Sequence, residues 1–280
     1  MEQSKLLYLR KKAAQIRRLI IEGVYNAGSG HPGGSLSCAD VMAYLYFEKM
    51  NVSAADPQDP GRDRFVLSKG HASPALYAAL ALKGYFPVEE IKTLRKLGSR
   101  LQGHPDMHTV PGVDMSTGSL GQGFSAACGM AKAAKITGAK YHVYTLLGDG
   151  ESQEGEVWEA AMFAAHYKLD NLTAFLDYNK LQIDGDVREV MNPDPLDEKF
   201  RAFGWEVRFI DGHDFRQIEA AVSSGVSGRP LMIICDTVKG KGVSFMENAV
   251  GWHGKAPKQP EYEIAVKELD SALQEFAEVE

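Results

Sequence analysis

The sequence predicts an α/β protein with a doubly wound, largely parallel sheet. Short apolar segments, each long enough for one strand, alternate with longer segments of helical periodicity along the 280 residues. The apolar segments are nearly continuous, as in strands that helices cover on both faces. No linker divides the chain, so we expect a single domain over residues 1–280.

The first element is predicted to be an amphipathic helix over residues 4–26. Apolar side chains recur there at spacings of three and four, at Leu6, Leu9, Ala13, Ile16, Leu19 and Ile20. The helix is expected to end at the glycines of residues 27–30. A second helix is expected over residues 37–50, with Ser35 or Ser37 as its candidate cap.

The rest of the chain alternates strands with helices. Strands are expected at residues 64–68, 142–147, 172–177, 205–210 and 231–236. Helices are expected at residues 72–82, 87–97, 124–137, 196–203 and 260–279. Two more are expected, one that contains Ala160 and Ala164 and one that runs from a cap at residues 211–214 to about Ser224. Loops are expected at residues 51–62, 98–119, 186–196 and 237–258, and long irregular loops inside a compact domain are usually functional.

Composition excludes several classes of protein. The net charge of −6 and the lack of a basic run argue against a nucleic-acid partner. The three cysteines, Cys38, Cys128 and Cys235, lie in apolar segments without metal-like spacing, as reduced thiols of a cytoplasmic protein do. The N-terminus has no uninterrupted apolar region of a signal peptide, and no run approaches the roughly 20 apolar residues that span a membrane.

Residues 141–185 form a predicted βαβ unit, and its strands should be parallel neighbours. Asp149, between Gly148 and Gly150, follows the first strand, and Asn179 follows the second. Both side chains then lie at the sheet edge where ligands bind in open α/β folds. A carboxylate with an amide oxygen suits Mg²⁺ or Ca²⁺, whose remaining ligands would be carbonyls, water and phosphates.

A plainer interpretation is that Asp149 and Asn179 are turn residues, which bond to their own backbone. The short motif alone would favour that interpretation, but the position of the paired Asn favours a metal site. Residues 118–123 open a helix with glycines, which either bring backbone N–H groups close to an anion or permit close packing.

Four histidines, His31, His71, His104 and His253, lie next to glycines in turns or loops. Any one of them could be a solvent-exposed or capping side chain. Four in similar settings favour groups that transfer protons near neutral pH or bind hydroxyls and phosphates.

The stretch GDGESQEGEVWEAA followed by DYNKLQIDG resembles the transketolase family of thiamin diphosphate enzymes. The resemblance covers the whole chain and implies the thiamin diphosphate-binding fold of a PP-type domain. It also implies two cofactors, thiamin diphosphate and Mg²⁺ (or Ca²⁺), with the metal on Asp149, Asn179 and the backbone carbonyl of Leu181. Lys180 stands where the broader thiamin signature often has a second Asn, and transketolases commonly have Lys there.

The motifs GHPG, LSKGHA, QGHPD and WHG are similar to those of the transketolase active-site histidines. By that resemblance, His31 and His253 contact the reacting hydroxyls and carbonyl of the ketose donor. His71 lies nearer the diphosphate, and His104 lies nearer the first hydroxyl of the donor. All four are therefore predicted to be catalytic, and His71 also binds the cofactor.

The resemblance adds further cofactor-binding residues. These are Gly118, Leu120, Gly150, Glu154 and Asn179, although the family often has Pro where Ser119 stands. The family residue that matches Glu154 links two active sites across a dimer interface. An acidic residue in the first turn of a helix would also account for Glu154.

Two parts of a transketolase site are not matched by this chain. In the family, the glutamate beside the aminopyrimidine and the groups that grip the sugar phosphate belong to later domains. The resemblance therefore implies the N-terminal subunit of a split transketolase, with pyrimidine and C-terminal domains on a separate C-terminal subunit. Such an enzyme would transfer a two-carbon ketol (glycolaldehyde) unit from a ketose phosphate to an aldose phosphate in the pentose phosphate pathway. The working assembly is expected to be a dimer or a heterotetramer with two copies of each subunit.

Other functions remain in competition. A transketolase-like enzyme for a sulfonated or branched sugar is one alternative, and a catalytically silent binding homologue is another. A deoxyxylulose phosphate synthase or a 2-oxo acid dehydrogenase subunit is disfavoured by the set of four histidines. A nicotinamide dehydrogenase is disfavoured because the first βαβ unit lacks GxGxxG followed by an acidic residue.

Overall fold

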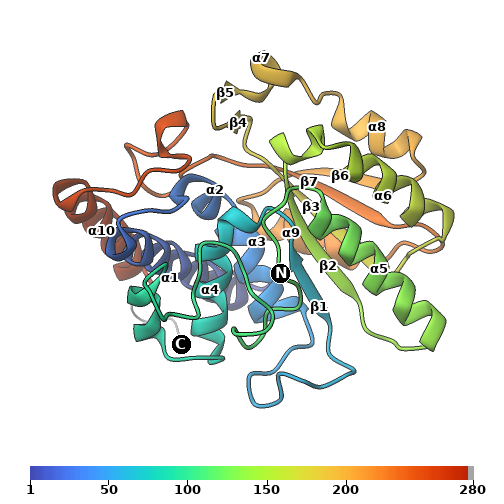
Figure 1. The fold of residues 1–280 in the computed structure, drawn as a ribbon, viewed down its shortest axis with the longest axis horizontal. Helices are drawn as coiled ribbons and strands as arrows, with labels where there is room; N and C mark the ends of the chain where they lie inside the picture. The colour runs from blue at the N-terminus through green and yellow to red at the C-terminus, as the bar shows by residue number, and fades with distance from the viewer. Residues whose placement is uncertain (277–280) are drawn as a thin grey trace.

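The computed structural model describes residues 1–276, and its centre is a five-stranded parallel sheet. The strand order is β1-β2-β3-β7-β6 (Figure 1). The strands are β1 (Arg64–Leu67), β2 (Val143–Gly148), β3 (Leu172–Tyr178), β6 (Glu206–Asp211) and β7 (Leu231–Asp236). Each expected strand is present to within a residue, and the doubly wound α/β class is confirmed.

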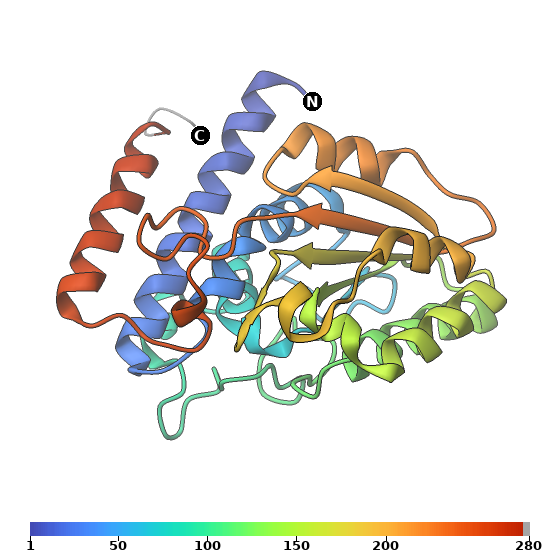
Figure 2. The same cartoon turned by 90° about the horizontal axis from the view of Figure 1, so that it is seen from above.

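Helices cover both faces of the sheet (Figures 1 and 2). One layer contains α1 (Gln3–Ala27), α2 (Pro32–Ser37), α3 (Ala39–Tyr44), α4 (Ser73–Lys83), α9 (Phe215–Ser223) and α10 (Gln259–Gln274). The other contains α5 (Gln122–Thr137), α6 (Gly155–His166) and α8 (Leu196–Ala202). Successive residues of the central strand point to opposite layers, so Phe175 packs in one core and Leu176 in the other. Both are fully buried, which explains why the strands have continuous apolar sequences.

The helix expected over residues 37–50 is present over residues 39–49, but a short helix that was not expected precedes it. The chain forms α2 from Pro32, turns at Cys38, and continues as α3 and a π-helical turn over Leu45–Lys49. Proline favours the first helical position, because its missing N–H has no partner there in any case. Neither candidate cap acts as one: the Ser35 hydroxyl donates to the His31 carbonyl at 2.7 Å, and the Ser37 hydroxyl donates to Asp177 at 2.6 Å.

Two other boundaries differ from expectation. The helix expected over residues 87–97 is a shorter 3₁₀ segment, Val88–Thr93. The expected loop at residues 186–196 contains α7 (Val187–Met191), which follows a hairpin of β4 (Leu181–Gln182) and β5 (Gly185–Asp186). The predicted end of the closing helix, residues 277–279, lies outside the described residues.

The expected βαβ unit is present. β2 and β3 pair in parallel with Gly148 opposite Asp177, and the N–H of Asp149 donates to the Asp177 carbonyl at 3.3 Å. Asp149 and Asn179 therefore leave adjacent strand ends at the same edge. Among the described residues, no helix combines the length and apolar character needed to cross a bilayer.

Candidate active site

A cavity of about 300 Å³ opens where the carboxyl ends of β1, β2 and β3 meet the start of α2. Most of the predicted site residues line it together: His31, His71, Gly118, Leu120, Asp149, Gly150, Glu154, Asn179, Leu181 and His253. His104 does not line this cavity. Its ring packs over Gly118, where an added Cβ would lie 3.0 Å from the ring, and its side chain is exposed.

Asp149 is fixed at the cavity by backbone donors. The side chain is 3% exposed, and its carboxylate accepts the N–H of Gly150 at 2.7 Å and the N–H of Lys180. Lys180 has a φ of 68°, in the left-handed region, and this conformation accompanies the bond from its N–H to Asp149. Burial raises the pKa of Asp149, and the nearby negative charge of Asp177 raises it further. A bound cation would favour the ionised form of this carboxyl.

Asn179 and Leu181 supply neutral oxygens to the same cavity. The amide nitrogen of Asn179 donates to Asp177 at 3.0 Å, while its oxygen accepts the N–H of Leu181 at 3.2 Å. The carbonyl of Leu181 accepts a hydrogen bond from the Lys239 ammonium at 2.6 Å. A cationic group is thus already bound to one of the predicted metal ligands.

The chemistry of the donor set fits a hard divalent cation. In residues 1–276, no three His, Cys, Asp or Glu side chains gather in a metal-binding group. The candidate set is instead one carboxylate, one amide oxygen and one backbone carbonyl around a cavity. Such hard oxygens fit Mg²⁺ or Ca²⁺, which complete their coordination with water and phosphate oxygens.

The glycine-rich start of α5 binds an anion that belongs to the chain itself. The carboxylate of Glu151, 2% exposed, accepts the N–H groups of Gly121 and Gly148 at 2.9 Å each. It also accepts the hydroxyl of Ser68, which in turn accepts the N–H of Phe124 at 2.8 Å. Glu151 therefore ties together the ends of two strands and the beginning of a helix. The sequence left two interpretations open for the glycines of residues 118–123, an anion site or close packing. The group bonded to the N–H of Gly121 is a carboxylate of the chain itself.

Three of the four predicted histidines form a cluster. The ring centroids of His31, His71 and His253 lie 5.3–5.4 Å apart. Burial lowers the pKa of His31 to about 4, with a contribution from Arg95, and lowers that of His253 to about 3, with a contribution from Lys239. Burial also holds the pKa of His71 well below its usual value. All three imidazoles are therefore neutral near pH 7, and each can accept one proton or hydrogen bond and donate another.

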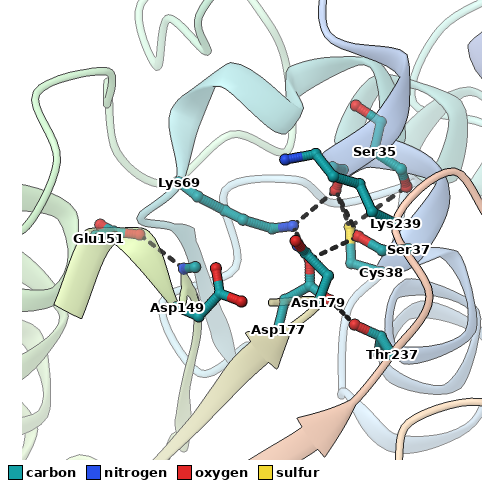
Figure 3. A network of polar contacts seen from close by, with 12 residues as sticks. Ser35, Ser37, Cys38, Lys69, Asp149, Glu151, Asp177, Asn179, Thr237 and Lys239 are labelled. Atoms are coloured by element: carbon teal, nitrogen blue, oxygen red, sulfur yellow. Dashed lines mark hydrogen bonds and ion pairs between the residues drawn. The ribbon is translucent and has the colours of Figure 1, made fainter. Parts of the chain in front are cut away.

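Two buried lysines of the cavity are not among the residues that the sequence predicts. Lys69 and Lys239 are each 1% exposed and line the cavity (Figure 3). The ammonium of Lys239 contacts Nδ1 of His253 at 2.9 Å, besides its bond to the Leu181 carbonyl. Lysine is almost always a surface residue, so only the position of Lys69 directly after a buried strand could have signalled it. Together the two side chains bring positive charge to a cavity that would suit an anionic ligand.

Known proteins resemble this chain over most of its length. Residues 9–277 match the family model described as transketolase, thiamine diphosphate binding domain. The chain is 51% identical over 264 residues to the 6-deoxy-6-sulfo-D-fructose transketolase subunit SqwG of Clostridium sp. strain MSTE9, covering 94% of this chain and 96% of the other. It is 43% identical over 270 residues to one of the subunits of the apulose-4-phosphate transketolase of Phocaeicola vulgatus, covering 96% of each. A solved transketolase variant from Pichia stipitis has a TM-score of 0.86 at 32% identity, covering 97% of this chain and 46% of that chain.

Replacing Glu151 by Gln is expected to destabilise the fold by about 1–3 kcal/mol, because an amide would leave a buried backbone N–H facing an NH₂ group. Chemical denaturation of the variant measures this loss. Glu159→Gln on the exposed side of α6 is the matched control and should change the free energy of unfolding by less than about 0.5 kcal/mol. Equal stability of the two variants would contradict the proposed role of Glu151.

Acid should destabilise the protein partly through His31. The unfolded chain binds a proton on this histidine near its ordinary pKa of 6.5, whereas the folded chain does so only near 4. Its contribution to stability is thus present above pH 6.5 and is lost as the pH falls toward 4. We expect His31→Asn to lose less stability than wild type between pH 7 and pH 5, as measured by urea unfolding. An unchanged pH dependence would mean that folding does not lower the pKa of His31.

Proposed function

Because the chain belongs to the transketolase family, we propose that it is the thiamin diphosphate-binding subunit of a two-subunit transketolase. The observation that carries the proposal is a single cavity that joins three oxygen donors, Asp149, Asn179 and Leu181, to a cluster of neutral histidines. The proposed reaction moves a two-carbon ketol unit from a ketose phosphate to an aldose phosphate. The intact donor set and histidine cluster disfavour a silent binding homologue.

The cofactor and metal would be held by groups already around the cavity. Asp149, Asn179 and the Leu181 carbonyl would bind Mg²⁺ (or Ca²⁺), and the ammonium groups of Lys69 and Lys239 would attract the diphosphate. When bound, thiamin diphosphate supplies the stabilised carbanion that ketol transfer requires. The protein supplies position, charge and proton transfer.

The histidines would handle the protons of the donor hydroxyls. Nδ1 of His253 accepts a hydrogen bond from the Lys239 ammonium, so Nε2 carries the ring proton and is the nitrogen left to donate to a substrate oxygen. Within the described residues, Nδ1 of His31 is buried and has no hydrogen-bond partner. A neutral imidazole with a free nitrogen can accept the proton that a hydroxyl loses when the neighbouring C–C bond breaks, and can return it to the product. His71 lies against both rings, and His104, over Gly118, would act only at the entrance.

The proposal includes a partner subunit. Two relatives that match this chain nearly from end to end are named as transketolase subunits, whereas the solved Pichia stipitis chain is about twice as long. We propose that a C-terminal subunit contributes the pyrimidine-binding domain, and that two copies of each form a heterotetramer. We also assign the protein to the cytoplasm, supported by three buried free thiols of the kind kept reduced there.

A second candidate substrate is a sulfonated ketose. Identity to the sulfofructose transketolase subunit is 51%, against 43% to the apulose-4-phosphate enzyme's subunit. The cavity of this chain faces the reacting carbons, and the proposed partner would bind the charged end of the sugar. Choice between a phosphate and a sulfonate would then depend mainly on the partner.

Metal-dependent cofactor binding is expected to be lost in Asp149→Ala, because the only carboxylate of the donor set is removed. Calorimetry of the assembled enzyme with thiamin diphosphate, with Mg²⁺ and after chelation, measures this. His253→Ala is the contrasting variant: it should keep cofactor binding and slow donor cleavage at least tenfold, since its ring serves proton transfer. Unchanged cofactor affinity in Asp149→Ala would refute the metal assignment.

Turnover is expected only with a C-terminal subunit present. The assay offers fructose 6-phosphate or 6-deoxy-6-sulfofructose as donor and an aldose phosphate as acceptor, to the chain alone and to the complex. A complex that prefers the sulfonated donor selects the second candidate. Full activity of the chain alone would rule out the two-subunit proposal.

A further inference from the structure

One buried carboxylate lies directly beneath the candidate metal site and belongs to none of the predicted site residues. Asp177, on β3, is 1% exposed and accepts hydrogen bonds from four segments of the chain (Figure 3). Its Oδ2 accepts from Ser37 at 2.6 Å, from the Lys69 ammonium at 2.5 Å and from the Asn179 amide at 3.0 Å. Its Oδ1 accepts from the hydroxyl of Thr237.

The contact with Asn179 determines how that amide is oriented. An amide can present either its oxygen or its NH₂ group to a given neighbour, and the two ends have the same shape. Asp177 forms an ion pair with Lys69, and an ionised carboxylate only accepts hydrogen bonds. The NH₂ group of Asn179 must therefore face Asp177, and the oxygen faces Leu181 and the cavity.

The ion pair beneath the site is costly in itself. Lys69 and Asp177 are each 1% exposed, and burying two charges costs free energy that an apolar pair would avoid. The Lys69 ammonium also donates to the Gly34 carbonyl at 2.6 Å, so each charge has more than one hydrogen-bond partner. Stability alone therefore gives little reason for a buried ion pair at this position. The need to orient a metal ligand would account for it.

We propose that Asp177 is a positioning residue that keeps the oxygen of Asn179, rather than its nitrogen, directed toward a bound metal ion. The inference rests on the proposed function, since it requires that the cavity binds a metal. Groups behind the metal ligands commonly change metal affinity by about 10–100-fold when they are replaced. Asp177 acts through Asn179 and does not touch the ion.

The test uses the full chain with its partner subunit and measures Mn²⁺ binding by electron paramagnetic resonance in the presence of thiamin diphosphate. Asp177→Leu keeps the approximate shape but removes the oxygen that holds the NH₂ group of Asn179, so the amide can turn round and Mn²⁺ affinity should fall about 10–100-fold. Thr237→Val is the matched control: it removes a donor to the other oxygen of Asp177 and should change Mn²⁺ affinity by less than about threefold.

The double variant Asp177→Leu with Asn179→Asp separates orientation from folding. The carboxylate now stands at position 179, where either end presents an oxygen to the cavity without a partner at position 177. Affinity for Mn²⁺ should return to within about threefold of wild type or exceed it. If Asp177→Leu alone does not fold, this comparison still decides the matter, because the double variant conserves the total charge and keeps a carboxylate near the Lys69 ammonium.

Wild-type affinity in folded Asp177→Leu would overturn the inference, and so would a double variant that binds Mn²⁺ more than about tenfold weaker than wild type. Failure of the proposed function is distinguishable, because wild type itself would then bind no Mn²⁺ with the cofactor. In that case both proposals fall together.

Discussion

The parallel pairing of β2 with β3 in one register determines where the groups of the candidate site stand. Gly148 lies opposite Asp177, so the residues that follow each strand leave the sheet at the same level. A shift of one residue would send the side chains of β3 to the opposite layer, exchanging the environments of Phe175 and Leu176. The two apolar cores therefore fix the register, and the register places Asp149 beside Asn179.

Around that edge the structure separates charged groups from neutral ones. The histidines lose their positive charge through burial, while Lys69 is held as a cation by Asp177. Lys239 lies between the two sets, bonded to Leu181 on one side and to His253 on the other. The cavity thus combines positive charge, which suits an anion, with uncharged imidazoles, which suit proton transfer. Lys239 contacts both groups, through the Leu181 carbonyl and the His253 ring.

The fold could be predicted from the sequence because its strands are continuous apolar runs between helical segments. The short helix before Cys38 could not, because its sequence, residues 32–37, contains two consecutive glycines, which disfavour a helix interior. The approach of Asp149 to Asn179 at one sheet edge followed from topology, whereas the third proposed oxygen donor, the Leu181 carbonyl, followed only from the family resemblance. Lys69, Glu151 and Asp177 escaped prediction for a common reason. Charged side chains are expected at the surface, and only tertiary contacts reveal the partners that make their burial tolerable.

The carboxylate of Glu151 has a consequence for how a ligand would be received. It holds the end of β1, the end of β2 and the start of α5 through bonds made entirely within the chain. These walls of the cavity are thus preorganised, and an arriving ligand does not have to offset the entropy of ordering them. The N–H of Gly121 at the start of α5 is also already bonded to an internal carboxylate, so attraction of a diphosphate would depend mainly on the lysines. Association with an anionic ligand should accordingly slow as salt screens those two ammonium groups, while the shape of the walls persists.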